Sequence, residues 1–190
     1  LANMEEVLGA MGDLVREGKI RHFGLSNETT WGLAQWVRLA EEKGLPRAVS
    51  VQNEYSLIRR IFDHDMAELS HHEDVGLLAY SPLAGGMLSG KYFDGATPKG
   101  SRKDYQKGFW RLNEQSDAAT HAYHEVAARH GLDPVQMAIA FCRTRPFITS
   151  TIVGATSTEQ LTQVLGAVDV TLSPEVLADI DATYRRFPRP

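Results

Sequence analysis

The stretch that decides the fold is Leu78-Ala79-Tyr80-Ser81-Pro82-Leu83-Ala84-Gly85-Gly86. It completes an apolar run that begins at Val75 and ends abruptly at a proline and a pair of glycines. Apolar runs of this length, bounded by turn residues, are typical of buried parallel strands. Because Pro82 has no N–H to donate to a sheet, the strand must end close to it. Ligands of α/β proteins bind at the carboxyl ends of such strands, so the loop that follows is a candidate ligand site.

Composition limits what the chain can do. It has 190 residues, a formal net charge of -4 and 43% hydrophobic residues, which is enough apolar material for a core. There is no basic excess to attract nucleic acid or an anionic membrane. The single cysteine, Cys142, excludes a disulfide within the chain and favours a reducing compartment. No apolar stretch is long enough to cross a membrane, and the first residues do not resemble a signal peptide. We therefore expect a cytoplasmic protein without nucleic-acid binding or membrane insertion.

Strand and helix patterns alternate along the sequence. Strands are expected over Ile20–Leu25, Ala48–Gln52, Val75–Ala79 and Ile148–Val153, with intervening helices that include 30–43 and 62–71. This spacing suits parallel strands that are neighbours in chain order and are joined by crossover helices. A long segment at about 91–114, rich in Gly, Lys, Ser and aromatic residues, breaks the rhythm. Loops of that length are usually functional lids or disordered.

The count of strands favours part of a closed barrel. A (β/α)8 barrel takes about 250 residues and eight strands, and this chain is short on both counts. It also opens with a helical pattern that no strand precedes. The fold class is therefore α/β, of the (β/α)8 TIM-barrel type, with only the second half (about four βα units) present in a single domain spanning residues 1–190. On periodicity alone, an open doubly wound sheet stays the alternative.

Two glycine-rich turns carry phosphate-binding patterns. Gly85–Lys91 has the spacing of a P-loop, but Tyr92 stands where a P-loop needs Ser or Thr to hold Mg²⁺. We therefore favour a turn that lets a ligand approach the backbone closely. In Val153–Leu161 a strand pattern leads into a helix, and Thr156 and Glu159 fit a capping box. Free amides at a helix N-terminus also bind phosphate, so a plain cap and a phosphate site both stay open here.

Four segments resemble, in order and at family-like separations, the aldo-keto reductases, in particular the branch of Tas-like proteins and potassium-channel β-subunits. The segments are Gly18–Asn27, Val51–Leu57, Ala79–Gly86 with Ser89–Tyr92, and Gly154–Thr156 with Glu159–Leu161. The resemblance implies a (β/α)8 barrel that binds a nicotinamide cofactor across the carboxyl ends of its strands and reduces aldehydes and ketones without a metal. It also implies NADP (as NADPH) as the cofactor and a small-molecule carbonyl compound as the substrate.

The resemblance assigns cofactor-binding roles to individual residues. Ser26, Asn27 and Gln52 would hydrogen-bond the nicotinamide carboxamide, which needs the donors and acceptors that hydroxyl and amide side chains supply. Tyr80 would stack on the nicotinamide ring and so fix its reacting face. The rest of the cofactor would be held by Ser81, Pro82, Leu83 and Ala84 at the pyrophosphate, by Lys91 and Arg102 as cationic clamps, and by Gly154, Thr156, Gln160 and Gln163 toward the adenosine.

Two departures from the family pattern concern the adenosine end. Val164 stands where the family often has asparagine, and no arginine lies near Gln160 to hold a 2′-phosphate. NAD therefore stays an alternative to NADP. Taken singly, each candidate residue also has an ordinary structural explanation, such as a strand-end cap, a core ring or a solvated charge.

The resemblance also implies what is absent. In the family the catalytic aspartate, tyrosine, lysine and histidine come from the first half of the barrel, so no catalytic residue is expected in this chain. Tyr55 lies in the strand that carries Gln52 and does not correspond to the catalytic tyrosine. The pair His71-His72 has no convincing metal-ligand spacing, and polar side chains that face solvent explain it better.

Three functional hypotheses follow from the sequence. The chain is the cofactor-binding half of a reductase, a non-catalytic nicotinamide-nucleotide-binding half-barrel or channel-β-subunit-like binding module, or a phosphate-binding α/β domain with no reductase link. A half-barrel leaves unpaired sheet edges and an uncovered apolar layer, and both drive association. We therefore expect it to form a homo-oligomer or to need a missing amino-terminal half.

Overall fold

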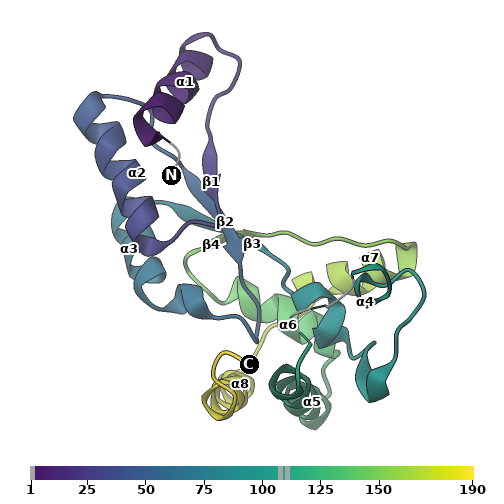
Figure 1. Ribbon diagram of the computed structural model, residues 1–190. Helices are drawn as coiled ribbons and strands as arrows, with labels where there is room; N and C mark the ends of the chain where they lie inside the picture. The colour runs from purple at the N-terminus through teal and green to yellow at the C-terminus, as the bar shows by residue number, and fades with distance from the viewer. Residues whose placement is uncertain (1–2, 107–108, 110–111) are drawn as a thin grey trace. The chain divides into compact units, whose positions relative to one another are not determined.

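The computed structural model describes residues 3–106, 109 and 112–190 (Figure 1). Its strands are β1 (Gly24–Ser26), β2 (Ser50–Glu54), β3 (Gly76–Tyr80) and β4 (Ile148–Thr151). Its helices are α1 (Met4–Arg16), α2 (Thr30–Lys43), α3 (Asp65–Glu73), α4 (Arg102–Tyr105), α5 (Glu114–Arg129), α6 (Pro134–Arg143), α7 (Thr158–Leu165) and α8 (Pro174–Arg186). Short 3-10 turns occupy Ile61–Asp63, Ala84–Ser89, Phe93–Gly95 and Gly166–Asp169.

Within the described residues, the strands form a four-stranded sheet in the order β1-β2-β3-β4. β1 and β2 pair in parallel, with Gly24 opposite Ser50 and Ser26 opposite Gln52. The other pairings also advance in the same direction along both strands, through backbone bonds that join Gly76 to Val49, Tyr80 to Tyr55, Leu77 to Phe147 and Ala79 to Ile152. Parallel strands in chain order with helices between them confirm the predicted α/β class, and they are consistent with part of a (β/α)8 barrel.

The predicted strand bounds were wrong by a few residues. Ile20 is not in a strand, because its N–H donates to the Leu14 carbonyl (3.3 Å) at the end of α1. β2 and β3 extend past the predicted Gln52 and Ala79 to Glu54 and Tyr80, since ladder pairing and not apolar character sets their ends. β4 ends at Thr151 instead of Val153.

The helix expected over 62–71 is also displaced. His64 has a non-helical ψ of -129°, which separates the 3-10 turn Ile61–Asp63 from α3. The long segment at 91–114, expected to be a lid or disordered, contains a 3-10 turn (Phe93–Gly95) and the short helix α4. Part of that segment lies outside the described residues.

Contacts among the described residues divide the chain into two compact units. The first unit comprises Leu1–Asn53, Phe62–Leu78 and Phe147–Ser150, and the second comprises Glu54–Ile61, Ala79–Pro146 and Thr151–Pro190. The single domain expected from the sequence stays a prediction.

In the first unit, α1 packs on α2, and α2 packs on α3 (Figure 1). Leu8, Trp36 and Ala40 are the buried centre of the α1–α2 contact. α2 has the predicted bounds because both of its ends carry local signals. The Thr29 hydroxyl accepts the Gly32 N–H (3.0 Å), and Gly44 ends the helix in a left-handed conformation at φ 62°.

In the second unit, α5 packs on α6 and α8, and α5 and α8 lie side by side (Figure 1). Arg60 is buried there, 7% exposed, with its guanidinium 2.8 Å from Asp181 and 4.4 Å from the centre of the Tyr184 ring. The ion pair and the aromatic contact compensate the lost hydration of the charge. Burial raises the pKa of the Tyr123 phenol, which donates to the Leu57 carbonyl (3.0 Å). These polar contacts tie segments distant in sequence into one core.

The start of α6 carries two local signals. Asp133 caps the helix by accepting the Gln136 N–H (2.9 Å), and Pro134 occupies its first turn. Gln136 stands at the third helical position, where a glutamine can complete a capping box. Its side chain donates to the Gln163 carbonyl (3.1 Å) instead.

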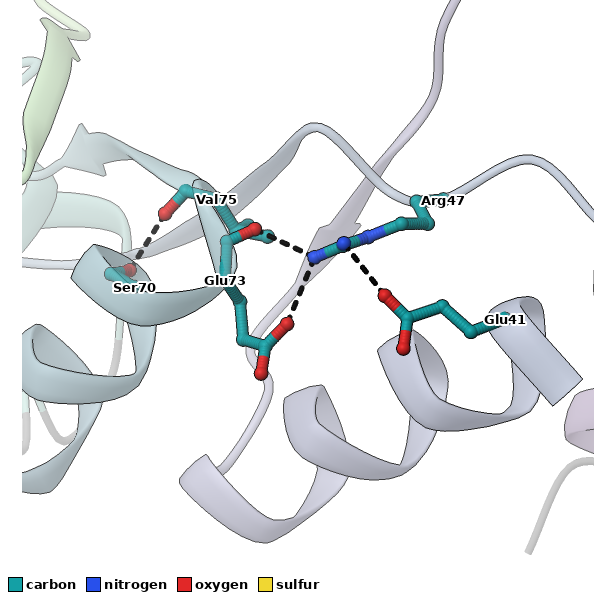
Figure 2. A network of polar contacts seen from close by, with 5 residues as sticks. All are labelled: Glu41, Arg47, Ser70, Glu73 and Val75. Carbon is teal, nitrogen blue, oxygen red and sulfur yellow. Dashed lines mark hydrogen bonds and ion pairs between the residues drawn. The ribbon is translucent and has the colours of Figure 1, made fainter.

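An arginine between α2 and β2 joins the ends of two helices, as Figure 2 shows. Arg47 donates to the Glu41 carboxylate (2.8 Å) through Nη1, and to the Glu73 carboxylate (2.9 Å) and backbone carbonyl (2.7 Å) through Nη2. Next to it, the Ser70 hydroxyl donates to the Val75 carbonyl (2.7 Å). These contacts fix the turn that leads from α3 into β3.

We expect Arg47→Lys to lower the free energy of unfolding by about 1 kcal/mol, because an ammonium group cannot reproduce the forked contacts to Glu41 and Glu73. Urea denaturation measures the change. Arg38→Lys is the matched control, since Arg38 and Glu42 form an exposed pair on α2 (2.6 Å) and exposed pairs contribute little. Equal changes in the free energy of unfolding would show that the contacts of Arg47 stabilise the fold no more than an exposed ion pair does.

Candidate functional site

Ser26, Asn27 and Gln52, the predicted carboxamide ligands, lie together in the first unit. Ser26 at the end of β1 is the register partner of Gln52 in β2. The Asn27 N–H donates to the Gln52 carbonyl (3.0 Å), and the Asn27 amide donates to the Ser26 hydroxyl (3.2 Å). Ser26 and Asn27 are exposed, and Gln52 is half-buried. Hydroxyl and amide groups are thus gathered at the end of β1, beside the middle of β2.

The turn after β1 is held by Asn53, a residue for which no role was predicted. Asn27 is left-handed, with φ 56°, a conformation that asparagine tolerates better than most residues. Asn53 accepts the N–H of Glu28 (3.1 Å) and donates to its carbonyl (2.8 Å). The Glu28 carboxylate accepts the Trp36 indole N–H (2.9 Å) and lies in the space beside Gly32. The position of Asn53 directly after Gln52 was the signal available in the sequence.

Tyr80 and the turn that follows it belong to the second unit. Tyr80 is half-buried at the end of β3, and its carbonyl accepts the Tyr55 N–H (3.2 Å). Ser81 and Ala84 have φ values of 55° and 50°, in the left-handed region that strains residues with a side chain. Such strain costs on the order of 1 kcal/mol or more per residue and concentrates at functional sites. Pro82 is buried. Leu83 packs against a buried cluster of α6 and α7, so its backbone is the part that a ligand could meet.

The glycine pair makes room for the predicted cationic clamps. Gly85 and Gly86 have φ values of 69° and 98°, and a Cβ on either would collide with other side chains. Lys91 occupies that space at Gly86, while the Phe109 ring and the Arg102 stem lie at Gly85. The Tyr92 hydroxyl donates to the Gly85 carbonyl (3.1 Å). The structure therefore brings Lys91 and Arg102 to the same turn. Phe109 and Tyr92, which cover that turn, were not identified from the sequence.

The segment after this turn is anchored on α5. The Phe93 ring stacks on His121 (3.9 Å between ring centres) and meets His124 edge-on (4.8 Å). His124 Nε2 lies 3.1 Å from the Leu88 carbonyl oxygen. Burial lowers the pKa of His124, an effect that the Leu88 carbonyl partly offsets. Leu88 and Phe93 thus hold the chain on both sides of Lys91.

At the start of α7, two predicted residues contact each other. The Gln160 side-chain oxygen accepts the backbone N–H (3.0 Å) and the hydroxyl (3.2 Å) of Thr156. The predicted Thr156–Glu159 capping box was wrong by one residue, because Ser157 is the cap and accepts the Gln160 N–H (3.3 Å). Glu159 turns back toward its own N–H and the Ser157 hydroxyl, and both lower the pKa of its carboxyl.

Gln163 and Gly154 are less directly arranged for a ligand. Gln163 donates to the Asp133 carboxylate (2.9 Å), which links α7 to the start of α6. Gly154 is exposed and has open space around it. Val164 is buried against Val135 and Ile139. Val164 is therefore a core residue.

Neither a metal centre nor a membrane span was found in the described part of the chain. There, no group of three or more His, Cys, Asp or Glu side chains could hold a metal ion. No helix built from those residues is long and apolar enough to cross a membrane.

Comparison with known proteins identifies the family. The aldo/keto reductase family model matches residues 2–185, so the chain belongs to this family. It is 45% identical over 186 residues to the protein tas of Escherichia coli (strain K12), covering 97% of the chain and 54% of that protein. It is 36% identical over 165 residues to an aldo-keto reductase of Babesia bovis, covering 83% and 58%. It is 31% identical over 189 residues to a putative voltage-gated potassium channel subunit beta of Schizosaccharomyces pombe, covering 94% and 54%.

These similarities confirm the predicted family and branch. The chain spans about half the length of the curated relatives that it matches. This share and the parallel strands are consistent with the carboxyl-terminal half of a (β/α)8 barrel. The roles assigned to individual site residues stay predictions. So does the expectation that the candidates of both units open on one end of the sheet.

We expect stability to fall as the pH drops below about 6.5, in part because of His124. Its folded-state pKa is lowered by burial, so the unfolded chain takes up the proton first and gains stability from it. The contribution of neutral His124 is complete above the unfolded pKa and is lost as the pH falls through the folded one. Thermal unfolding of His124→Gln at pH 7.5 and 5.5 should show a smaller drop than the wild type. His71→Gln, at an exposed position on α3, is the control, and an unchanged drop in His124→Gln would contradict the assignment.

Proposed function

We propose that this chain is the cofactor-binding part of an NADPH-dependent aldo-keto reductase, and that the complete protein reduces aldehydes or ketones of small molecules. The observation that carries the proposal is the polar group of Ser26, Asn27 and Gln52, gathered where β1 ends beside its parallel neighbour β2 in a chain of this family. A carboxamide has one oxygen acceptor and an NH₂ donor, and this group offers both kinds of partner.

The other candidate residues suit a dinucleotide as well. The strained turn at Ser81 and Ala84 presents backbone and a hydroxyl, and Lys91 and Arg102 supply positive charge beside it. Tyr80 offers a flat ring on which the nicotinamide can stack. When bound, the cofactor supplies the hydride, and these residues bind it and orient its ring. We propose that the proton donor comes from protein outside this chain, and that the complete protein is cytoplasmic.

NADPH is proposed over NADH by resemblance and charge. Lys91 and Arg102 are the cations that lie at the glycine turn, whereas Ser157, a further candidate for the extra phosphate, is engaged as the cap of α7. The specificity therefore depends on Lys91 and Arg102 in this proposal. NADH is the alternative that a parallel titration would reveal.

A second candidate function is a nicotinamide-nucleotide-binding module without turnover. The similarity to the putative voltage-gated potassium channel subunit beta of Schizosaccharomyces pombe favours it. Assay of the complete protein for carbonyl reduction separates the two, since both bind the cofactor and one consumes it. Membership of the reductase family leaves no support for the third hypothesis, an unrelated phosphate-binding domain.

In the complete protein, Tyr80→Ala should weaken NADPH binding by about 1 kcal/mol, roughly a fivefold rise in Kd, through the loss of ring stacking. Fluorescence titration of NADPH measures the change. Phe187→Ala, which removes an aromatic ring at the end of α8, is the matched control and should leave the Kd unchanged. An unchanged Kd for Tyr80→Ala would argue against the assigned role of this ring.

The chain by itself should neither turn over carbonyl substrates nor stay monomeric. Loss of a positioned general acid costs about 10² to 10⁴ in rate. Leu161, Leu165 and Val168 are 44%, 55% and 62% exposed, and β1 and β4 are the outer strands of the sheet among the described residues. Exposed apolar side chains and open strand edges promote association. Light scattering and an NADPH oxidation assay with an aldehyde panel test this prediction, with the complete protein as control. A stable monomer with robust turnover would contradict it.

A further inference from the structure

The side chain of Asn53, in β2, forms two hydrogen bonds with the backbone of the turn that follows β1. Its side-chain oxygen accepts the Glu28 N–H (3.1 Å), and its side-chain nitrogen donates to the Glu28 carbonyl (2.8 Å), across a separation of 25 residues. A backbone N–H can only donate and a carbonyl can only accept. The orientation of the Asn53 amide is therefore fixed by its partners.

Glu28, whose backbone Asn53 holds, follows directly after the left-handed Asn27. Even for asparagine the left-handed region is less favourable than the right-handed or extended one, so the conformation gains from support by its surroundings. That support comes from the Asn27 N–H bond to the Gln52 carbonyl on one side and from the Asn53 grip on Glu28 on the other. If Glu28 were released, Asn27 could relax, and its contact with the Ser26 hydroxyl (3.2 Å) would be lost.

We propose that Asn53 is a positioning residue for cofactor binding, which holds Ser26 and Asn27 in place through the backbone of Glu28 without touching the cofactor itself. This inference rests on the proposed function, because it assumes that Ser26 and Asn27 meet the nicotinamide carboxamide. Preorganised ligand groups lose less entropy on binding, so a released turn binds the same cofactor less tightly.

The test uses the complete protein with Asn53→Ala, Asn53→Asp and two comparison variants. Asn53→Ala should raise the Kd and KM for NADPH roughly tenfold, the order of effect expected from losing one or two net hydrogen bonds, and leave kcat at saturating cofactor within about twofold. Asn53→Asp keeps the acceptor for the Glu28 N–H but sets a carboxylate oxygen against the Glu28 carbonyl, so it should raise the Kd at least as much as Asn53→Ala. Amide hydrogen exchange at Glu28 should accelerate in Asn53→Ala, which removes the acceptor of the Glu28 N–H.

Ser70→Ala is the matched control for a merely structural effect. It removes a buried side-chain bond to a backbone carbonyl in the same unit, away from the turn after β1. It should lower stability and leave the Kd for NADPH unchanged. Gln52→Ala reports on the site itself and should weaken binding if the proposed function is right.

The outcomes separate the two proposals. A wild-type Kd in Asn53→Ala, together with weak binding in Gln52→Ala, overturns the positioning role and leaves the proposed function standing. A Ser70→Ala Kd raised as much as that of Asn53→Ala also overturns it, because stability then explains the loss. If Asn53→Ala does not fold, Asn53→Asp decides, and a wild-type Kd there overturns the proposal. If the wild type binds no NADPH, the proposed function fails and the positioning role fails with it.

Discussion

The parallel pairing of β1 with β2 is the constraint on which the first unit depends. It sets Ser26 opposite Gln52, so a hydroxyl side chain and an amide side chain from distant parts of the sequence lie next to each other in the sheet. A slip of one residue would turn these side chains to opposite faces. The absence of a side chain at Gly24 permits this register, because a Cβ there would collide with Ser50. Close backbone approach in the strand thus determines which polar groups meet beyond it.

Both turns that carry candidate residues contain strained backbone held by side chains. Asn27 is left-handed beside the Asn53 grip, and Ser81 and Ala84 are left-handed beside a glycine pair whose carbonyls accept hydroxyls from Tyr92 and Ser89. Hydrogen bonds from side chain to backbone offset conformations that the local sequence alone would not adopt. Turns that are held in this way suit ligand binding, because little order remains to be gained when the ligand arrives.

Local signals in the sequence were sufficient where structure is local. The bounds of α2 follow from Thr29 and Gly44, and the start of α6 follows from Asp133 and Pro134. Strand ends were displaced because pairing with a neighbour sets them. The cap of α7 was misplaced since both Thr156 and Ser157 can serve, and the Gln160 side chain decides between them. The role of Asn53 could not be predicted, because its partner lies 25 residues away. The partner is also a backbone group, which every residue carries, so no residue type in the sequence marks it.

The amides on α7 have a thermodynamic consequence for any ligand that recruits them. Gln160 already accepts from Thr156, and Gln163 already donates to Asp133. A ligand at this helix would exchange an internal hydrogen bond for an external one, and such exchanges yield little net free energy. The contribution of α7 to binding would lie in discrimination between ligands. A molecule that cannot replace the broken hydrogen bond leaves a polar group unsatisfied and therefore binds poorly. The helix would therefore contribute more to binding specificity than to affinity.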